Sequence, residues 1–257
     1  MDDKTLHAVD LNFYQSVGAM LANSGAGEVV ETQALYLTCC GFPASEFNVA
    51  FLKLPIAAEA AGEAIERAEA YFRPRKLPFR VSIRKGFEGA CAGRLLDSGY
   101  RELKATPGML LSPIAEPAAP RADLAVRRVH SSEQLQHFQA TATRGFGLPA
   151  QAGPIFLTQH LLELPNVRLY VGYLEDEPAC SSALIATGEV AGIYWVATLE
   201  GFRGRGLGEA ITWEAVRGGV QMGCGLASLQ ASEMGQGLYA RMGFDVVAEY
   251  LNFESPG

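Results

Sequence analysis

The sequence lacks the cysteine and histidine patterns that hold metal ions. Its 257 residues include five cysteines and four histidines, but no CxxC pair and no HExxH run. The number of cysteines is odd, and Cys39 and Cys40 are adjacent, so a disulfide framework is not expected. We therefore expect reduced thiols in a cytoplasmic protein, and no metal.

Long apolar runs and an excess of positive charge are also missing. No stretch approaches the roughly 20 apolar residues of a membrane span, and the first residues, MDDKTLHAVDLNFY, have no basic start like that of a signal peptide. The net charge is −7, which argues against bulk attraction to nucleic acid or to an anionic membrane. We expect neither partner, while an acidic surface weakly favours a cationic substrate such as an amine.

Proline is concentrated at one place that divides the chain. Residues 112–123, SPIAEPAAPRAD, include three prolines and no helical or strand period, which is typical of an extended linker. We expect a first lobe at 1–111, the linker at 112–123 and a second lobe at 124–257. On both sides, helix and strand patterns alternate, which predicts an α/β fold with a mixed sheet.

The expected elements follow from hydrophobic period and from glycine and proline positions. In the first lobe, helices are predicted at 6–21, 58–72 and 89–97, and strands at 29–38, 48–54, 79–83 and 110–111. In the second lobe, helices are predicted at 133–143, 154–162, 208–222 and 235–242, and strands at 124–129, 167–174, 179–187, 190–198, 226–230 and 244–253. Ser131 or Ser132 is a suitable N-cap for the helix at 133–143.

The segment that carries chemistry is 198–209, TLEGFRGRGLGE. A predicted strand enters a glycine-rich loop that opens into a helix. Gly204, Gly206 and Gly208 let the main chain approach a ligand, and the helix start offers free N–H groups and a positive dipole end. With Arg203 and Arg205 nearby, this is a site suited to a pyrophosphate.

The spacing within this loop distinguishes between classes of phosphate site. A P-loop requires a lysine that is absent here, and a Rossmann fingerprint has different glycine spacing and lies early in its fold. Arg203-x-x-Gly206-x-Gly208 instead resembles the R/Q-x-x-G-x-G/A signature of the GCN5-related N-acetyltransferase (GNAT) family. In that family, the loop holds the pyrophosphate of coenzyme A.

A second segment strengthens the resemblance. Residues 238–244, LYARMGF, are similar to the LY-x-x-x-GF segment of the family, and the similarity extends over about 124–253. Residues 47–112 also resemble the non-catalytic lobe of tandem bacterial members. The resemblance implies two GNAT-like lobes. Gly86-Phe87-Glu88-Gly89 is taken to occupy the loop position in the first lobe, which is therefore predicted to bind no coenzyme A.

The resemblance also implies roles for individual residues. Tyr239 corresponds to the tyrosine near the acyl-CoA sulfur and is the candidate general acid. Ser232 stands where many members have asparagine, and either bonds to pantetheine or caps the following helix. The remaining candidate coenzyme-binding residues are Val196, Ala197 and Thr198 on the strand, whose main chain would meet pantetheine, and Arg203, Gly204, Arg205, Gly206, Leu207 and Gly208 in the loop.

The implied activity is transfer of an acetyl group from acetyl-CoA to a primary amine of a small molecule. A non-catalytic acyl-CoA binder and a protein N-acetyltransferase remain alternatives. Glu233, Glu200, Tyr194 or a water chain could serve as the general base. The segment 143–149, TRGFGLP, either covers the acceptor or simply joins two helices. The protein is expected to be a monomer or a homodimer.

Overall fold

The computed structural model describes residues 2–21, 27–114 and 119–256. The chain divides into two compact units: the first comprises Met1–Ser16 and Met109–Asp245, and the second Val17–Gly108 and Val246–Gly257. The division differs from the expected lobes at both chain ends, because each end belongs to the unit built mainly from the other half. Hydrophobic period shows that a terminal segment forms a helix or a strand but not which core it joins.

The first unit is built around a sheet with strand order β11-β10-β9-β8-β7. β10 and β11 are parallel, and the other pairs are antiparallel. Its strands are β7 (Ala125–Arg128), β8 (Val167–Leu174), β9 (Glu177–Thr187), β10 (Val190–Thr198) and β11 (Leu226–Gln230). Its helices are residues 3–16 of α1 (Asp3–Leu21), α4 (Ser132–Gly145), α5 (Ala152–Phe156), α6 (Leu207–Gln221) and α7 (Glu233–Arg241), with short 3-10 turns η4 (Gln159–Leu162) and η5 (Glu200–Phe202).

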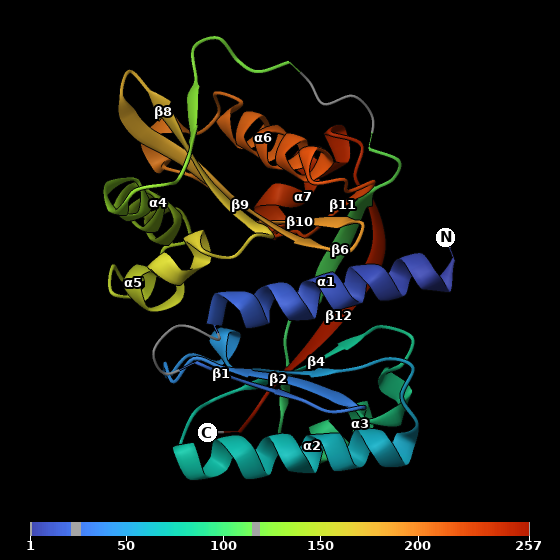
Figure 1. The fold of residues 1–257 in the computed structure, drawn as a ribbon. Helices are drawn as coiled ribbons and strands as arrows, with labels where there is room; N and C mark the ends of the chain where they lie inside the picture. The colour runs from blue at the N-terminus through green and yellow to red at the C-terminus, as the bar shows by residue number, and fades with distance from the viewer. Residues whose placement is uncertain (1, 22–26, 115–118, 257) are drawn as a thin grey trace. The chain divides into compact units, whose positions relative to one another are not determined.

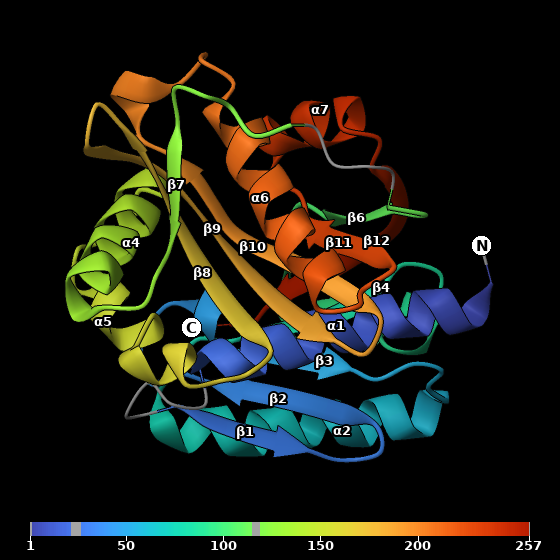
Figure 2. The same cartoon turned by 45° about the horizontal axis from the view of Figure 1, so that its top comes forward.

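The helices of the first unit cover two faces of this sheet. Figure 1 and Figure 2 show α6 on one side of β8, β9 and β10, with α4 and α1 on the other. The alternation of side chains along β10 agrees, since Ile193 joins the apolar core with α6 and α7 whereas the Tyr194 hydroxyl bonds to Asn12 of α1. The main apolar core therefore lies on the α6 and α7 side.

The second unit has its own sheet and core. Its strand order is β1-β2-β3-β4-β12, with β5 beside β12, and only β3 and β4 among these pairs are parallel. The core buries Phe72, Phe79 and Phe253 against the sheet, and each such ring contributes roughly 2–3 kcal/mol of burial free energy. The elements are β1 (Glu28–Glu31), β2 (Leu35–Cys39), η1 (Ser45–Phe47), β3 (Val49–Leu52), α2 (Ala58–Phe72), η2 (Arg73–Arg75), β4 (Arg80–Arg84), η3 (Glu88–Ala90), α3 (Ala92–Asp97) and β5 (Arg101–Glu102). Two further strands, β6 (Thr106–Leu111) and β12 (Asp245–Glu254), have residues in both units.

Most predicted elements are present, and three differ. The strand predicted at 29–38 is two antiparallel strands, because the Thr32 hydroxyl accepts a bond from the Leu35 amide (3.0 Å) and closes a turn. The helix predicted at 154–162 is α5 followed by η4, interrupted at Leu157, whose carbonyl accepts from the Gln139 side chain at 2.8 Å. The helix predicted at 89–97 begins at Ala92, after the 3-10 turn at Glu88–Ala90.

The segment Gly86–Gly89 was expected at the position that corresponds to the glycine-rich loop, and it lies elsewhere. It follows β4 and leads into α3. In the order of elements, the connection that corresponds to the glycine-rich loop of the first unit is the one between β3 and α2, residues 53–57. Glycine content alone pointed to the wrong connection of the second unit.

Candidate active site

The strands β10 and β11 separate at the centre of the first unit. They pair at Val190↔Leu226, Ala191↔Ala227 and Gly192↔Ser228. β10 then continues to Thr198 and β11 to Gln230, and no further pairing between the two is seen among the described residues. Main-chain N–H and C=O groups on the facing edges are left without a strand partner there. The separation creates an edge to which an amide-containing chain can bond.

A bulge in β10 lies at this separation. The pairing with β9 shifts between Tyr194 and Ala197, and Trp195 has a φ of 50°, in the left-handed region. The Ser181 hydroxyl donates to the Trp195 carbonyl (3.1 Å) and holds the bulged peptide in place. A bulge turns main-chain groups out of the ladder. The residues after it, Val196–Thr198, are the ones predicted to meet pantetheine.

The loop after β10 leads directly into α6. The Arg203 Nε donates to the Thr198 carbonyl (3.2 Å) across the base of the loop. Gly204 and Gly206 both have a φ of 74°, a conformation that residues with a Cβ rarely adopt. Gly206 is the N-cap of α6, and Leu207 and Gly208 are its first helical residues.

The start of α6 differs from the starts of α4 and α7. Ser131 caps α4 in a reciprocal bond pair with Gln134, and the Ser232 hydroxyl caps α7 by accepting from the Gly235 amide (3.2 Å). The N-cap of α6 is a glycine, which makes no side-chain bond. Its first N–H groups and its dipole are thus directed at whatever occupies the loop, which is an arrangement for an anion. The sequence left two roles open for Ser232, and capping is the one that the structure shows.

The two arginines of the loop have different surroundings. The Arg203 guanidinium is held to the strand end, as described, whereas Arg205 lies with its guanidinium 5.7 Å from the Phe202 ring centroid. The carbonyl of Arg205 accepts a bond from the Arg121 side chain. Arg121 is paired with Asp123 at 2.5 Å, so the loop is tied to the residues just before β7. This contact was not foreseen from the sequence.

The helix that carries Tyr239, α7, approaches the start of α6 through Leu238. A Cβ placed on Gly208 would lie 3.3 Å from Leu238 Cδ2 and 3.5 Å from Thr198 Oγ1, so α7, α6 and the end of β10 converge there. Tyr239 is 7 % exposed and packs edge-to-face against Phe244 at 6.0 Å. Burial raises the pKa of its hydroxyl to about 12, so the proton is retained at neutral pH. Tyr239 shares its apolar core with Leu207, the first helical residue after the loop, and its role as general acid stays a prediction.

The three residues considered as general base have unequal environments. Tyr194 is half-buried and donates to Asn12 Oδ1 at 2.8 Å. Desolvation raises its pKa, so its hydroxyl stays protonated at neutral pH and offers no phenolate to accept a proton. Glu200 is exposed on η5 and lines a cavity of about 600 Å³ with Arg144 and Glu177. Glu233 is exposed at the first position of α7. The geometry selects none of the three as the base.

The segment 143–149 contacts the bulge. Phe146, which caps α4 at its C-terminus, is 49 % exposed and meets the Trp195 ring edge-on at 5.3 Å. A Cβ on Gly145 would lie 2.5 Å from the Ala197 Cβ. The segment thus borders the strand on the side opposite α6. The contact between the two aromatic rings was not predicted from the sequence, because it joins residues from separate elements.

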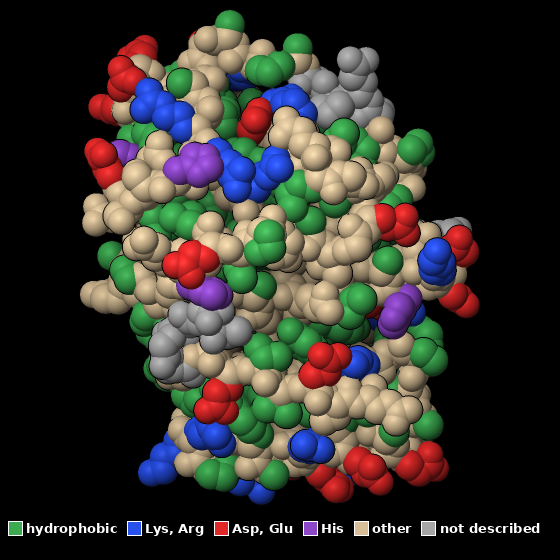
Figure 3. Space-filling view, viewed as in Figure 1, with side chains coloured by type: hydrophobic (Ala, Val, Ile, Leu, Met, Phe, Trp, Pro, Cys, Tyr) green, Lys and Arg blue, Asp and Glu red, His purple; other side chains and the backbone are tan. Residues whose placement is uncertain are grey.

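Other classes of site receive no support from the described residues. In that part of the chain, no group of three or more His, Cys, Asp or Glu side chains could hold a metal ion, and all five cysteines are buried and unbridged. None of the helices among residues 2–21, 27–114 and 119–256 has the length and apolar character needed to cross a membrane. On the face shown in Figure 3, Lys and Arg are interspersed with Asp and Glu, without a continuous basic area over its described residues.

Comparison with known proteins agrees with this geometry. The model of the acetyltransferase (GNAT) domain family matches residues 98–232. A GCN5-related N-acetyltransferase from Kribbella flavida has a similar structure, with a TM-score of 0.76 and 18% identity over 97% of this chain and 96% of that one. A GCN5-related N-acetyltransferase from Sphaerobacter thermophilus gives a TM-score of 0.67 and 18% identity over 87% and 78%. No curated protein sequence matches significantly.

A tandem structure is also similar. A tandem GNAT protein from the clavulanic acid biosynthesis pathway matches with a TM-score of 0.62 and 14% identity, over 90% of this chain and 85% of that one. At such identities, the structural likeness establishes the mixed α/β fold with its large mixed sheet. The family model covers more than half of the sequence, including the loop at 203–208. The chain belongs to the GNAT acetyltransferase family.

Proposed function

We propose that this protein is an N-acetyltransferase that moves an acetyl group from acetyl-CoA to a primary amine of a small molecule. The observation that carries the proposal is the convergence of three features: the separated strands β10 and β11, the glycine-capped start of α6, and the buried Tyr239. Family membership supports an acyltransferase that uses acetyl-CoA. The acceptor and the residue roles below are the further content of the proposal.

Each part of acetyl-CoA has a complement in this arrangement. The pyrophosphate binds at the free N–H groups of residues 204–208, with Arg203 supplying positive charge. The amides of pantetheine pair with the main chain of residues 196–198 along the open edge of β10. Beside the bulge, the amide of Val196 or Ala197 donates to the thioester oxygen and stabilises the negative charge that develops on it.

The reaction is direct attack of a neutral amine on the thioester carbon. A C–N bond forms, the C–S bond breaks, and the departing thiolate takes a proton from the Tyr239 hydroxyl. The attacking nitrogen loses its proton to the base or to water, and solvent restores the tyrosine proton. Because the pKa of Tyr239 is about 12, the phenol is protonated and able to donate over the whole physiological range. No metal is required in this scheme.

The test begins with calorimetric titration of acetyl-CoA into the wild-type protein and into the double variant Gly206→Asp, Gly208→Asp. Two carboxylates facing a pyrophosphate cost several kcal/mol, so we expect binding to weaken by about 100-fold or more. The matched control is Ala57→Asp, the same chemical change at the N-cap of α2 in the second unit. An Asp there is a good N-cap, and acetyl-CoA affinity should be unchanged.

A screen of primary amines with detection of released thiol then tests catalysis. Acetylation of at least one amine class by wild type, lost in the double variant, supports the proposal. Binding of acetyl-CoA without acetylation of any amine would instead favour a non-catalytic acyl-CoA binder. Folded wild-type protein that does not bind acetyl-CoA would contradict the proposed function altogether.

A further inference from the structure

Arg121 is a charged residue that lies outside the glycine-rich motif and yet contacts it. It belongs to the segment before β7, and its Nη1 donates to the carbonyl of Arg205. The rest of the guanidinium is fixed by Asp123, because Nε and Nη2 donate to its two carboxylate oxygens (2.9 and 2.5 Å). A bidentate pair of this kind has a defined geometry, so the remaining nitrogen, Nη1, is held toward the loop.

The carbonyl that Arg121 holds determines where the next N–H points. The peptide between Arg205 and Gly206 is trans, so its C=O and its N–H point in opposite directions. With the carbonyl bonded to Arg121, the Gly206 N–H is directed away from Arg121. Among the described residues, this N–H and those of Leu207 and Gly208 donate to no protein acceptor. The three groups are therefore available to an anion at the start of α6.

Little besides Arg121 keeps this peptide in its orientation. A Cβ built on Gly206 would lie 3.2 Å from Arg121 Nη1, and apart from the chain neighbours no other described residue has an atom within 4 Å of that position. Arg121 and Gly206 border a cavity of about 460 Å³ that Trp213 also lines, so a reversed peptide has room there. Glycine adopts positive and negative φ about equally readily. Without Arg121, a flip of the peptide should cost little.

The guanidinium of Arg121 is poorly placed to act through its charge. Asp123 takes up two of its nitrogens, and the negative charge of that carboxylate opposes the approach of a phosphate. We propose that Arg121 is a positioning residue, which keeps the Gly206 N–H directed at the pyrophosphate of the coenzyme. The inference rests on the proposed function. It gives the segment 112–123, expected to be a linker, a part in coenzyme recognition.

The test compares acetyl-CoA binding by calorimetry in wild type, Arg121→Met and Asp123→Asn. The first variant removes the bond to the Arg205 carbonyl, and the second removes the group that orients Arg121. We expect each to weaken binding by about tenfold, the loss of one N–H bond to a charged group. The matched control is Arg127→Met on β7, which removes the same charge from another ion pair (Asp176, 3.5 Å) and should leave the affinity unchanged. A role through charge predicts the opposite sign for Asp123→Asn, because a carboxylate near the pyrophosphate is removed.

The amide resonances of the loop glycines give a readout specific to orientation. In wild type with isotope-labelled glycine, saturating acetyl-CoA should move the amide proton signals of Gly206 and Gly208 downfield. In Arg121→Met, also at saturation, the shift of Gly206 should be lost and that of Gly208 retained, because Gly208 is held by the first turn of α6.

The outcomes separate the inference from the proposed function. Asp123→Asn that binds acetyl-CoA as tightly as wild type, or more tightly, would overturn the positioning role, as would an unchanged Gly206 shift in Arg121→Met. Loss of both glycine shifts together with a lower Tm would indicate a merely structural role and would overturn it as well. Folded wild type that does not bind acetyl-CoA would instead refute the proposed function, and the inference with it.

Discussion

Each unit contains a parallel strand pair joined by a helix, and the two differ in what lies beyond the pair. In the first unit, β10-α6-β11 pairs at three positions and β10 continues from Ile193 to Thr198. In the second, β3-α2-β4 also pairs at three positions, but β3 ends at Leu52, the residue after its last pair. Only the longer strand leaves an open main-chain edge. The open edge on which the proposed coenzyme site depends is therefore a feature of the longer strand of the first unit.

The connections to the helices reinforce this difference. After β10, Arg203 and the loop glycines lead into α6, whose N-cap, Gly206, makes no side-chain bond. After β3, the Lys53 ammonium is already bonded to Glu31 (2.7 Å) and to the Thr32 carbonyl (3.0 Å), and Pro55 has no N–H to offer. We therefore propose that the second unit is a GNAT-like lobe that binds no coenzyme A. Neither helix start has a side-chain cap. The two connections differ in the glycines of the first and in the proline and paired lysine of the second.

The largest expected effect is on kcat and concerns Tyr239, the proposed general acid, for which we propose no counterpart in the second unit. Loss of a general acid typically lowers the rate by about 100-fold or more, so Tyr239→Phe should lower kcat by that factor and leave the Kd for acetyl-CoA unchanged. The control is Tyr100→Phe, which removes a buried hydroxyl bonded to Glu69 at 3.1 Å and should cost about 1 kcal/mol of stability without a change in kcat. A kcat in Tyr239→Phe within about threefold of wild type would remove the tyrosine from the mechanism.

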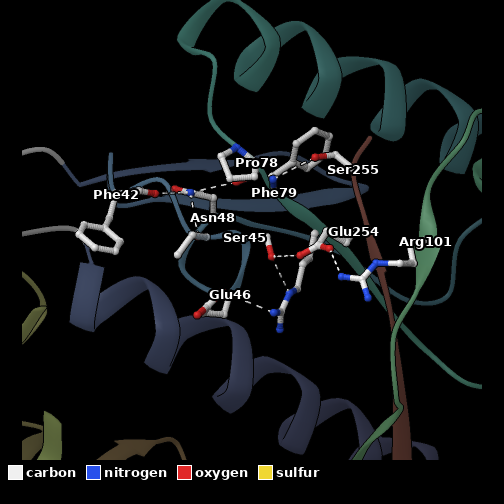
Figure 4. Close-up of polar contacts among 11 residues, drawn as sticks. Phe42, Ser45, Glu46, Asn48, Pro78, Phe79, Arg101, Glu254 and Ser255 are labelled. Carbon is white, nitrogen blue, oxygen red and sulfur yellow. Dashed lines mark hydrogen bonds and ion pairs between the residues drawn. The ribbon is translucent and has the colours of Figure 1, made fainter. Parts of the chain in front are cut away.

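A second expected effect separates stability from activity by means of two fully buried asparagines. Asn48 donates to the carbonyls of Phe42 (2.8 Å), Ala44 (3.1 Å) and Pro78 (3.0 Å), as Figure 4 shows. Asn48→Ala removes these bonds and also the acceptor of the buried Cys40 amide (3.2 Å). It should lower the free energy of unfolding by about 2 kcal/mol, measured by urea denaturation. Acetyl-CoA affinity of the folded variant should be unchanged.

The counterpart in the first unit should behave differently. Asn12 donates to the Ile185 carbonyl (2.9 Å) and accepts from Tyr194, the residue before the bulge. Asn12→Ala should therefore lower both stability and kcat/KM for the amine. If the two asparagine variants had the same kinetic profile, the functional distinction between the units would not hold.

The smallest expected effect is a pH dependence in the second unit. The Ser45 hydroxyl donates to Glu254 Oε1 (2.5 Å) and Arg101 pairs with the other oxygen, contacts drawn in Figure 4. The hydrogen bond from Ser45, and then the one from Arg101, lower the pKa of Glu254 below its ordinary value of 4.5. A lowered pKa contributes stability above the unfolded-state pKa, and this contribution is lost as pH falls through the lower, folded-state value.

Thermal unfolding of wild type and Glu254→Gln at about pH 6 and about pH 3 measures this contribution. Arg101 is 72 % exposed, so solvent screening keeps the effect to about 1 kcal/mol or less. Wild type should lose slightly more stability on acidification than the variant, while acetyl-CoA binding near neutral pH is the same in both. An equal loss in the two proteins would show that the ion pair and the Ser45 bond do not contribute.

The sequence was sufficient where local pattern decides the structure. The predicted ranges 58–72, 190–198 and 226–230 are the observed bounds of α2, β10 and β11, because each is a strongly periodic or continuously apolar run with glycine or proline near its ends. The loop at 203–208 was also predicted, since its chemistry lies in consecutive residues. Gly206 of this loop is the N-cap of α6, in the αL conformation that glycine permits.

What the sequence could not predict depends on contacts between distant segments. The bulge at Trp195 leaves no compositional mark, and its contact with Phe146 joins β10 to the end of α4. Asn12 lies 173 residues before the carbonyl to which it donates. Arg121 reads as part of the linker, and only its contact with the loop at 203–208 distinguishes it. The turn within 29–38 was missed because Thr32 is itself common in strands, and no glycine, proline, asparagine or aspartate marks the turn.

The exchange of chain ends between the units has a consequence for synthesis. β4 pairs with β12 from Tyr250↔Arg84 to Glu254↔Arg80, so β4 leaves the ribosome long before its partner strand is made. Until then, one edge of β4 is exposed, and an exposed strand edge invites pairing with other chains. Likewise, the first residues of α1 must wait for β9 and β10. Nascent chains stalled before β12 should therefore depend on chaperones, and emergence of β12 should end that dependence.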